Sequence, residues 1–125
     1  MKSDTTSTEE QTLLKINEAA NKFFTKYLFS TKGSKALSYL RDRGLSLDTI
    51  RKFKLGLSPS KNDDLIIFLK AEGYEEQYIE KAGLAFKPEN RPLVDRFKNR
   101  VMFPISNLDD RIVAFGGRSL NTAFG

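Results

Sequence analysis

The sequence lacks cysteine and histidine entirely, and it also has no tryptophan. Without cysteine there is no disulfide framework and no thiolate metal site. Without histidine there is no Ser-His-Asp triad, no histidine-based acid–base catalysis and no His-ligated zinc. These absences exclude the side-chain sets on which most hydrolytic sites depend.

Long hydrophobic runs are missing as well. No stretch approaches the ~20 consecutive apolar residues that a membrane-spanning helix needs, and the first residues, MKSDTTSTEEQ, contain no apolar signal core. The chain has 125 residues, of which 39% are hydrophobic and 30% charged, so its composition is that of one soluble domain. We therefore expect a cytoplasmic protein that does not contact membranes.

Positive charge is concentrated in two segments of the chain, whose net charge is +5. Residues 32–54 carry seven basic and two acidic side chains, and residues 91–118 carry six and three, whereas residues 55–90 carry four and seven. If the fold brings the two basic segments together, they form a surface for a polyanion such as nucleic acid. Ordinary solvated faces would give the same pattern, so charge alone leaves both interpretations open.

Apolar residues at helical spacing predict five helices in the first two thirds of the chain. Their expected ranges are residues 7–28, 34–44, 46–53, 62–72 and 75–82. The later residues predict strands at 84–86, 93–97, 100–105 and 111–118, after a short extended link at 55–59. Helices followed by strands indicate an α+β fold with a small antiparallel sheet. We expect residues 1–10 to be a flexible segment and residues 11–125 to form the domain.

Several helix ends carry local signals. Ser7, with Glu10 three residues later, has the pattern of a capping box. Ser34 and Ser46 are expected N-caps, and Asn62 or Asp63 is expected to cap the helix that ends near residue 72. Gly44 is expected to end a helix in the left-handed conformation.

A row of cations lies in the segment DRFKNR, residues 95–100. In an extended strand alternate residues share a face, so Arg96, Lys98 and Arg100 would line one side at ~6.6 Å intervals. Such a row could follow the phosphates of a single nucleic-acid strand. A solvated edge strand, where cations discourage aggregation, explains the same pattern. Both interpretations stay open.

Two adjacent glycines, Gly116 and Gly117, interrupt the last predicted strand. Glycines within a strand favour a bulge or the close approach of another backbone. Arg118 directly follows them and could present its guanidinium to a phosphate lying against the bare backbone. The alternative is a bulge that bends the strand over the core.

Other charged residues fit structural roles better than chemical ones. Asp63-Asp64 lies at a helix start and Asp109-Asp110 in a turn, where aspartates are common, and neither pair has a third acid beside it. We therefore predict no catalytic residue and no metal site in this chain. Arg51, Lys52 and Lys54 lie near a helix C-terminus, where the helix dipole favours cations regardless of function.

Three segments in order resemble the catalytic core of bacterial DnaG-type DNA primases. They are ALSYLRDRGLS with the following TI and FKLG (residues 36–56), DRFKNRVMFPI (95–105) and RIVAFGGR (111–118). The likeness extends from about residue 13 to residue 120. It departs from the family pattern at Val94, where an aromatic is usual, at Lys98, where arginine is common, and at Asp110, where glycine is frequent.

The resemblance implies that the chain is the N-terminal subdomain of the primase RNA-polymerase core, lacking the zinc ribbon, the Toprim domain and the helicase-binding domain. The parent protein would be a nucleotidyltransferase that makes short RNA primers on single-stranded template during DNA replication, at the replication fork in the bacterial nucleoid. It would use magnesium in the Toprim domain and zinc in the ribbon. Without the metal-binding acids, these 125 residues should be inactive alone.

The resemblance also implies partners and binding residues. We expect contacts with single-stranded template, with the RNA–DNA product and with the Toprim domain of the same chain, and a helicase contact through a domain missing here. By motif position, Arg43, Arg96, Lys98 and Arg118 are expected to bind nucleic acid, together with Arg100 of the cationic row. The alternative is a structural or domain-docking module with no DNA binding of its own.

Overall fold

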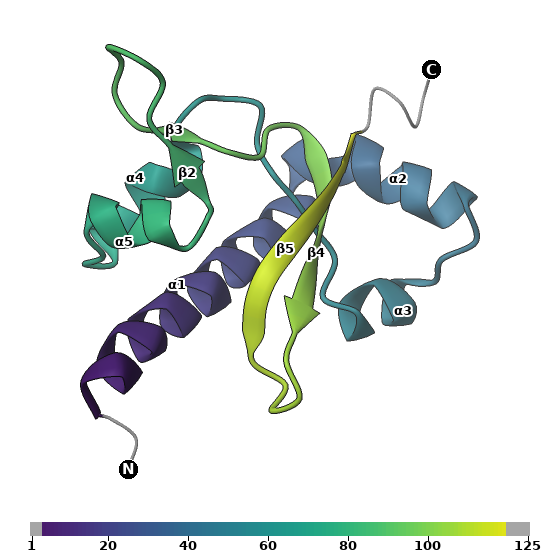
Figure 1. The fold of residues 1–125 in the computed structure, drawn as a ribbon. Coiled ribbons are helices and arrows are strands. Elements are labelled where there is room, and N and C mark those ends of the chain that lie inside the picture. Colours follow the sequence, from purple (N-terminus) through teal and green to yellow (C-terminus); the bar gives the residue numbers. More distant parts are fainter. Residues whose placement is uncertain (1–3, 120–125) are drawn as a thin grey trace.

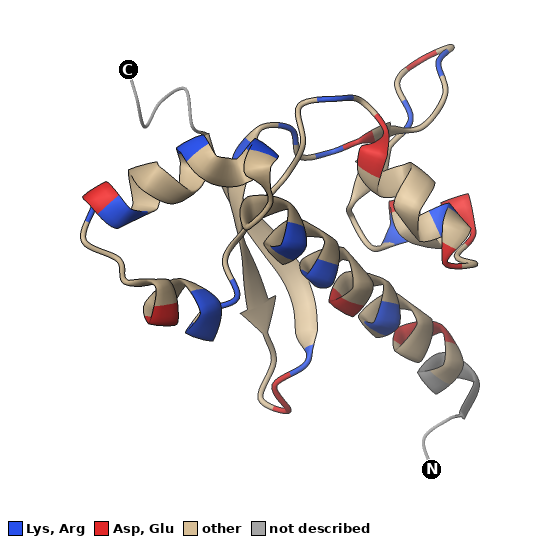
Figure 2. Cartoon of the chain, turned by 180° about the vertical axis from the view of Figure 1, so that it is seen from behind, with Lys and Arg blue, Asp and Glu red and all other residues tan. Residues whose placement is uncertain are grey.

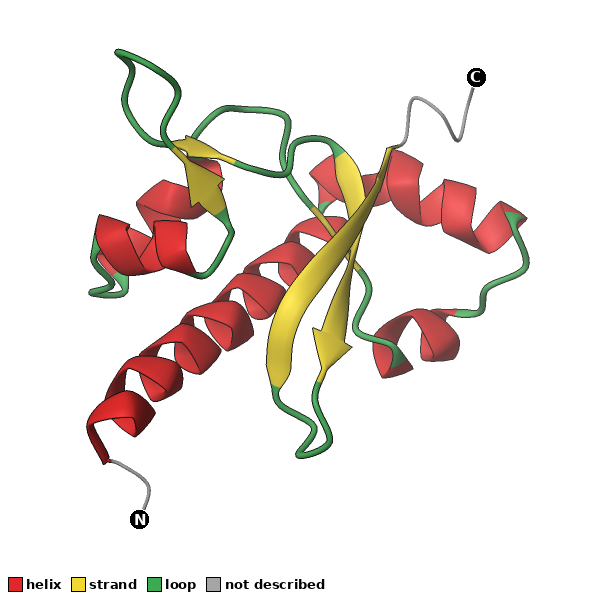
Figure 3. Ribbon diagram, in the orientation of Figure 1, coloured by secondary structure: helices red, strands yellow, loops and turns green. Residues whose placement is uncertain are grey.

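The computed structural model describes the backbone of residues 4–119 and the side chains of residues 8–119. In this range helices precede antiparallel strands, which confirms the expected α+β class (Figure 3). The elements, labelled in Figure 1, are α1 (Asp4–Leu28), the 3-10 turn η1 (Thr31–Gly33), α2 (Ser34–Asp42), α3 (Leu47–Lys52), β1 (Gly56–Leu57), α4 (Asp64–Ala71), α5 (Glu76–Lys81), β2 (Ala85–Phe86), β3 (Val94–Asp95), β4 (Arg100–Ser106) and β5 (Ile112–Ser119).

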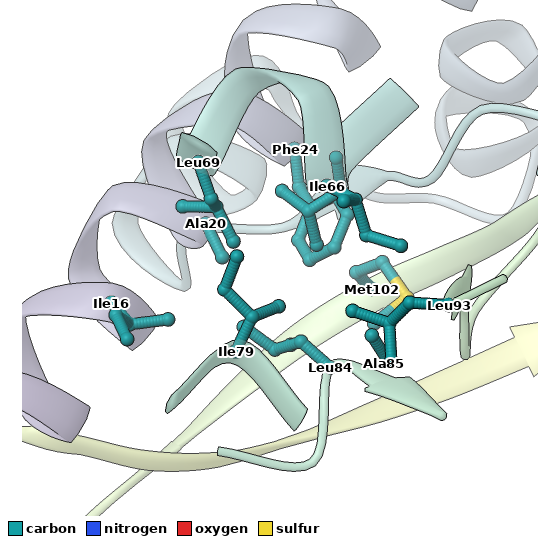
Figure 4. Packing of buried hydrophobic residues seen from close by; sticks show 11 residues of the cluster. Ile16, Ala20, Phe24, Ile66, Leu69, Ile79, Leu84, Ala85, Leu93 and Met102 are labelled. Atoms are coloured by element: carbon teal, nitrogen blue, oxygen red, sulfur yellow. The ribbon is translucent and has the colours of Figure 1, made fainter. Parts of the chain in front are cut away.

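The long helix α1 is the element against which most others pack (Figure 1). Ile16, Ala20 and Phe24 recur every four residues, so they share one face of the helix, and all three are buried. Figure 4 shows this face turned toward α4, α5 and the strands. The larger core cluster is completed by Leu65, Ile66, Leu69, Ile79, Leu84, Ala85, Leu93 and Met102.

A smaller core cluster lies beyond the C-terminal end of α1 and joins α2 and α3 to the sheet. Its buried members are Leu28, Ala36, Leu40, Ile50, Leu57 and Val101. Between the two clusters, β1 crosses α1 so closely that a Cβ on Gly56 would lie 2.6 Å from the carbonyl carbon of Phe24. Only glycine permits this crossing, which joins the two halves of the core.

The sheet has the strand order β1-β4-β5, and β2 and β3 form a separate antiparallel ribbon. In the β4–β5 hairpin the register shifts between Ile105 and Ser106, which leaves Val113 without a partner. The bulge therefore lies at Val113, not at the glycine pair. Gly116 faces Phe103 across the strands, and a Cβ on Gly116 would overlap the Phe103 ring. The glycine makes room for an aromatic ring, not for a bend in the strand.

The predicted strand at residues 93–97 is much shorter than expected. β3 ends at Asp95, residues 96–99 are irregular, and Asn99 has a φ of 55°. The prediction that Arg96, Lys98 and Arg100 line one face of a continuous strand is therefore wrong. The ~6.6 Å spacing of strand residues does not apply to them.

The helix starts were predicted with mixed success. Ser46 caps α3, since its Oγ accepts the backbone N–H of Thr49 at 3.1 Å. However, α1 already begins at Asp4, so Ser7 lies inside the helix, and α2 is capped by Gly33 with Ser34 as its first residue. Of the segment expected to be flexible, residues 1–3 lie outside the described residues, and residues 4–10 belong to α1. No helix in the described range has the length and apolar character needed to cross a membrane.

Candidate nucleic-acid interface

The segment between β3 and β4, residues 96–99, carries two of the predicted binding residues and is called here the β3–β4 connection. Backbone hydrogen bonds hold it at both ends. At its start the N–H of Arg96 donates to the carbonyl oxygen of Leu84 at 2.9 Å. At its end the N–H of Asn99 donates to the carbonyl oxygens of Ser58 and Pro59, both at 3.1 Å. The connection is thus irregular but fixed.

Asp95, directly before the connection, anchors it to α4. Its carboxylate oxygens accept the backbone N–H groups of Leu65 at 3.0 Å and Ile66 at 3.1 Å, in the first turn of α4. These are donors that a helix start leaves unpaired. Asn62 or Asp63 was expected to cap this helix, but Asp63 stands at the N-cap position and makes no side-chain cap bond. The cap comes instead from a residue 30 positions later in the chain.

Asp95 is only 2% exposed, and this burial raises the pKa of its carboxyl to about 6 from the ordinary 3.8. The bonds from Leu65 and Ile66 act in the opposite direction, and the nearby carboxylates of Asp63 and Asp64 raise the pKa further. No salt bridge within the described range compensates Asp95. It is therefore a buried acid stabilised by helix N–H groups alone.

Arg96 is exposed and oriented by two contacts. Its Nε donates to the carbonyl oxygen of Gly83 at 2.9 Å, and its guanidinium lies 5.5 Å from the ring centroid of Phe86. No acidic side chain pairs with it among residues 8–119. The terminal guanidinium nitrogens stay available as donors to an anion.

The remaining cations of this region come from the connection and from the neighbouring strand ends. Lys98 is exposed, and its Nζ donates to Oδ1 of Asn62 at 3.0 Å. Arg100 is half-buried and opposes Ser119, whereas the exposed Arg118 opposes Val101. Since side chains alternate between the two faces of a strand, Arg100 and Arg118 lie on opposite faces of the hairpin.

Arg43 lies apart from the β3–β4 connection. It is the C-cap residue of α2, exposed, with its guanidinium 5.4 Å from the ring centroid of Tyr39. Figure 1 shows the C-terminal end of α2 on the opposite side of the molecule from β2 and β3. The structure thus places Arg96, Lys98 and Arg100 along one short stretch of chain. Arg118 lies on the opposite face of the hairpin from Arg100, and Arg43 lies apart from all of them.

The described residues offer no ligand set for magnesium or zinc. No group of three or more His, Cys, Asp or Glu side chains comes together there, and the sequence has neither His nor Cys. The Asp63 and Asp64 carboxylates lie near enough to raise the pKa of the buried Asp95, but the Asp95 oxygens accept bonds from helix N–H groups. No metal-dependent step can be assigned to these side chains.

Sequence reasoning missed the residues that fix the connection. Asp95 stands 30 positions from its partner Leu65, and the N–H of Arg100 donates to Oγ of Ser58, 42 positions away, at 3.0 Å. Ser58 is 1% exposed. A polar residue within a predicted strand, such as Asp95, or in an extended link, such as Ser58, gives no local sign of such distant partners.

These features define a small α+β domain that presents arginine and lysine side chains on a backbone fixed by buried polar contacts. A family model described as "DNA primase catalytic core, N-terminal domain" matches residues 23–124. The chain belongs to this family, which confirms the resemblance seen in the three motifs.

Curated relatives named DNA primase support the assignment. The chain is 37% identical over 116 residues to that of Enterococcus faecalis and 44% identical over 102 residues to that of Deinococcus radiodurans. These matches cover 92% and 81% of the chain but 18% of each relative. The chain thus spans less than a fifth of the length of the primases it matches.

Solved structures show the same fold. The RNA polymerase domain of Mycobacterium tuberculosis primase DnaG, in complex with a double-stranded DNA oligomer with a 6-nucleotide overhang, matches with a TM-score of 0.83 and 34% identity, over 88% of this chain and 34% of that one. A DnaG primase catalytic domain bound to single-stranded DNA matches with a TM-score of 0.82 and 33% identity, over 91% and 37%. The Aquifex aeolicus primase structure, comprising zinc-binding and RNA polymerase domains, matches with a TM-score of 0.74 and 27% identity, over 90% and 27%.

Proposed function

We propose that this chain is the nucleic-acid-holding part of a DNA primase, a DNA-directed RNA polymerase that makes short RNA primers on single-stranded template during replication. The observation that carries the proposal is the β3–β4 connection. It holds exposed cations on a backbone fixed at both ends, within a domain of the primase family. In this proposal Arg96, Lys98, Arg100 and Arg118 contact the phosphates of template and RNA–DNA product, and Arg43 contacts them from the end of α2.

Two observations support nucleic acid as the ligand. Two of the solved relatives were determined in complex with double-stranded and single-stranded DNA. In addition, Arg96 and Arg118 are exposed and make no ion pair in the described part of the chain. Phosphate contacts of this type position a strand without reading its bases.

The chemistry of polymerisation belongs, in this proposal, to other parts of the primase. Magnesium would be held by acids of the Toprim domain and zinc by the ribbon, and the replicative helicase would be contacted by a further domain. The Aquifex relative, which has zinc-binding and RNA polymerase domains, is consistent with this division. The replication fork in the cytoplasm would be the place of action.

The test is oligonucleotide binding by fluorescence anisotropy across a salt titration. The variant Arg96→Ala/Lys98→Ala/Arg118→Ala should bind more weakly than the unchanged chain. Its slope of log affinity against log salt should be shallower by up to about 2, because each lost phosphate contact contributes about 0.7. The control Lys70→Ala/Lys81→Ala/Lys87→Ala loses the same charge from exposed positions outside the connection.

Equal slopes for the unchanged chain and the Arg96/Lys98/Arg118 variant would refute the proposal. That result would instead favour a domain-docking module, which predicts contact with the Toprim domain of the same primase and no oligonucleotide binding. NMR shift changes on adding that domain in trans measure the docking directly.

A further inference from the structure

A second group of cations surrounds a hollow of about 1050 Å³ between α1, the end of α3 and the β4–β5 turn. None of these cations belongs to the β3–β4 connection. The hollow, called here the α1–α3 hollow, is lined by Glu18, Asn21, Lys22, Thr25, Lys26, Phe29, Ser30, Arg51, Lys54, Leu55, Asp110 and Ile112.

The cations of the hollow come from two walls that are distant in sequence. Lys22 and Lys26 lie four residues apart on α1, so they share one face of the helix at a rise of about 6 Å. Arg51 and Lys54 come from the end of α3 and its link to β1. Figure 2 shows the corresponding blue segments on α1, on α3 and in the link. The fold therefore gathers four cations that the sequence presents as separate helix-end charges.

Lys54 occupies a position that usually favours glycine. Its φ is 58°, and the N–H of Leu55 donates to the carbonyl oxygen of Ile50 at 3.1 Å, which closes the end of α3. Helices ending in this way commonly have glycine in the left-handed position, because a Cβ is disfavoured there. The chain nevertheless places a long cationic side chain at this point, on the wall of the hollow.

The charge of the hollow is largely uncompensated. Glu18 and Asp110 are its acids, but the Glu18 carboxylate accepts the Arg111 Nε at 2.6 Å. Across the described residues, none of the four cations forms a salt bridge. Setting the paired Glu18 aside, four positive charges face the single negative charge of Asp110, a balance of +3. Such a field attracts a polyanion.

Phe29 is the aromatic residue of the hollow, and one face of its ring is covered by Arg51. The Arg51 guanidinium lies 4.6 Å from the ring centroid of Phe29. A base would need a free ring face on which to stack. With one face of Phe29 covered by Arg51, what the hollow chiefly offers is its four cations, which suit phosphates.

We propose that the α1–α3 hollow binds the sugar-phosphate backbone of a nucleic-acid strand, without sequence preference, as a contact separate from the β3–β4 connection. This proposal extends the nucleic-acid binding proposed above but depends on different side chains. Each of the two surfaces can therefore fail without the other.

The experiment compares four forms of the 125-residue chain in an anisotropy salt titration with a labelled single-stranded oligonucleotide. They are the unchanged chain, the Arg96→Ala/Lys98→Ala/Arg118→Ala variant, a hollow variant with Lys22, Lys26, Arg51 and Lys54 all changed to Gln, and a control with Lys35, Lys70, Lys81 and Lys87 changed to Gln. The hollow variant and the control lose the same charge, and the control positions are exposed and outside both surfaces.

The hollow variant should bind at least about tenfold more weakly at about 50 mM salt, with a slope shallower by up to about 3, while the control keeps the slope of the unchanged chain. Circular dichroism verifies that each form is folded. If the hollow variant does not fold, Lys22→Gln/Lys26→Gln, on the solvent side of α1, replaces it and should lower the slope by about half as much.

An unchanged slope in the hollow variant overturns the proposal that the hollow binds nucleic acid. It leaves the proposal for the β3–β4 connection unaffected. If only the hollow variant loses oligonucleotide binding, the result supports the hollow as a binding surface and refutes the binding role proposed for the β3–β4 connection. Inorganic tripolyphosphate and ATP are tested as competitors. Tight binding of either at the hollow, with oligonucleotide binding unaffected by the hollow variant, would identify a free polyphosphate site and overturn the proposal.

Discussion

Replacing Asp95 with asparagine is expected to remove most of the pH dependence of folding that this residue introduces between about pH 4 and pH 6. The carboxyl is buried, and burial raises its pKa to about 6 from the ordinary 3.8. In the unfolded chain the same carboxyl is in water and has its ordinary pKa. The folded chain therefore binds the Asp95 proton more tightly than the unfolded chain.

The sign of the effect follows from that difference. The unfolded chain releases this proton at lower pH, so the stabilisation from Asp95 is fully present below pH 3.8 and is lost as the pH rises through about 6. A pKa difference from 3.8 to about 6 corresponds to at most about 3 kcal/mol of unfolding free energy. That is a large part of the roughly 5–15 kcal/mol by which small domains are stable.

The measurement is urea unfolding followed by circular dichroism at pH steps from 4 to 7. Near pH 4 the folded Asp95 is mainly protonated, and both of its oxygens can still face the N–H groups of Leu65 and Ile66. Asparagine keeps the shape of the side chain but puts a donor amide nitrogen in place of one oxygen, so one of these two bonds is lost. The variant should be about 1–3 kcal/mol less stable near pH 4 and should approach the unchanged chain near pH 7. Asp109→Asn, an exposed turn residue, is the control. Parallel pH profiles for the unchanged chain and Asp95→Asn would refute the reasoning.

Three further changes test single contacts. Gly116→Val should destabilise the hairpin by about 1–3 kcal/mol because the new side chain overlaps the Phe103 ring, and thermal unfolding should show partial recovery with Phe103→Ala. Ser46→Ala should lower the free energy of unfolding by about 1 kcal/mol in urea, through loss of the bond to the Thr49 N–H. Arg43→Ala should change stability by less than about 0.5 kcal/mol, yet reduce the salt slope of oligonucleotide binding by about 0.7 in anisotropy.

Local signals predicted those features whose partners are local. Ser46 caps α3 through a bond to a residue three positions away, and Gly44 ends the α2 region with a φ of 97°. Ser34 failed as a cap because Gly33 takes that place after η1. Gly33 lies so close to the Leu28 carbonyl that any Cβ would collide with it. A close approach to the end of α1 decides this start, and a pattern of single residues does not reveal it.

The largest error, the extended cationic strand, also has a long-range cause. The side chains of residues 93–100 alternate as in a strand, with Arg96, Lys98 and Arg100 at every second position. What ends β3 is the engagement of Asp95 with α4 and of Asn99 with Ser58 and Pro59, partners more than 25 positions away. The motif order was enough to find the family, but the placement of its cations depends on these distant bonds.

The role of Asp95 in placing the cations leads to a last prediction, in which charge and geometry have opposite effects. Asp95→Asn and Asp109→Asn each raise the net charge from +5 to +6, which by charge alone strengthens binding to a polyanion. Asp109→Asn should therefore bind a single-stranded oligonucleotide as tightly as the unchanged chain or slightly more tightly.

At pH 7 the global stability of Asp95→Asn should be close to that of the unchanged chain, but the loss of one bond to Leu65 or Ile66 should loosen α4 locally from the segment that carries Arg96 and Lys98. The variant should therefore bind more weakly despite the same gain in charge. Anisotropy at about 50 mM salt measures both affinities, and hydrogen exchange of the Leu65 and Ile66 amides reports whether the attachment has opened. Faster exchange with undiminished binding would show that the connection need not be held in place to bind. Weaker binding together with faster exchange would show that the buried Asp95 carboxylate, which forms no salt bridge in the described residues, holds Arg96 and Lys98 in the positions needed for binding.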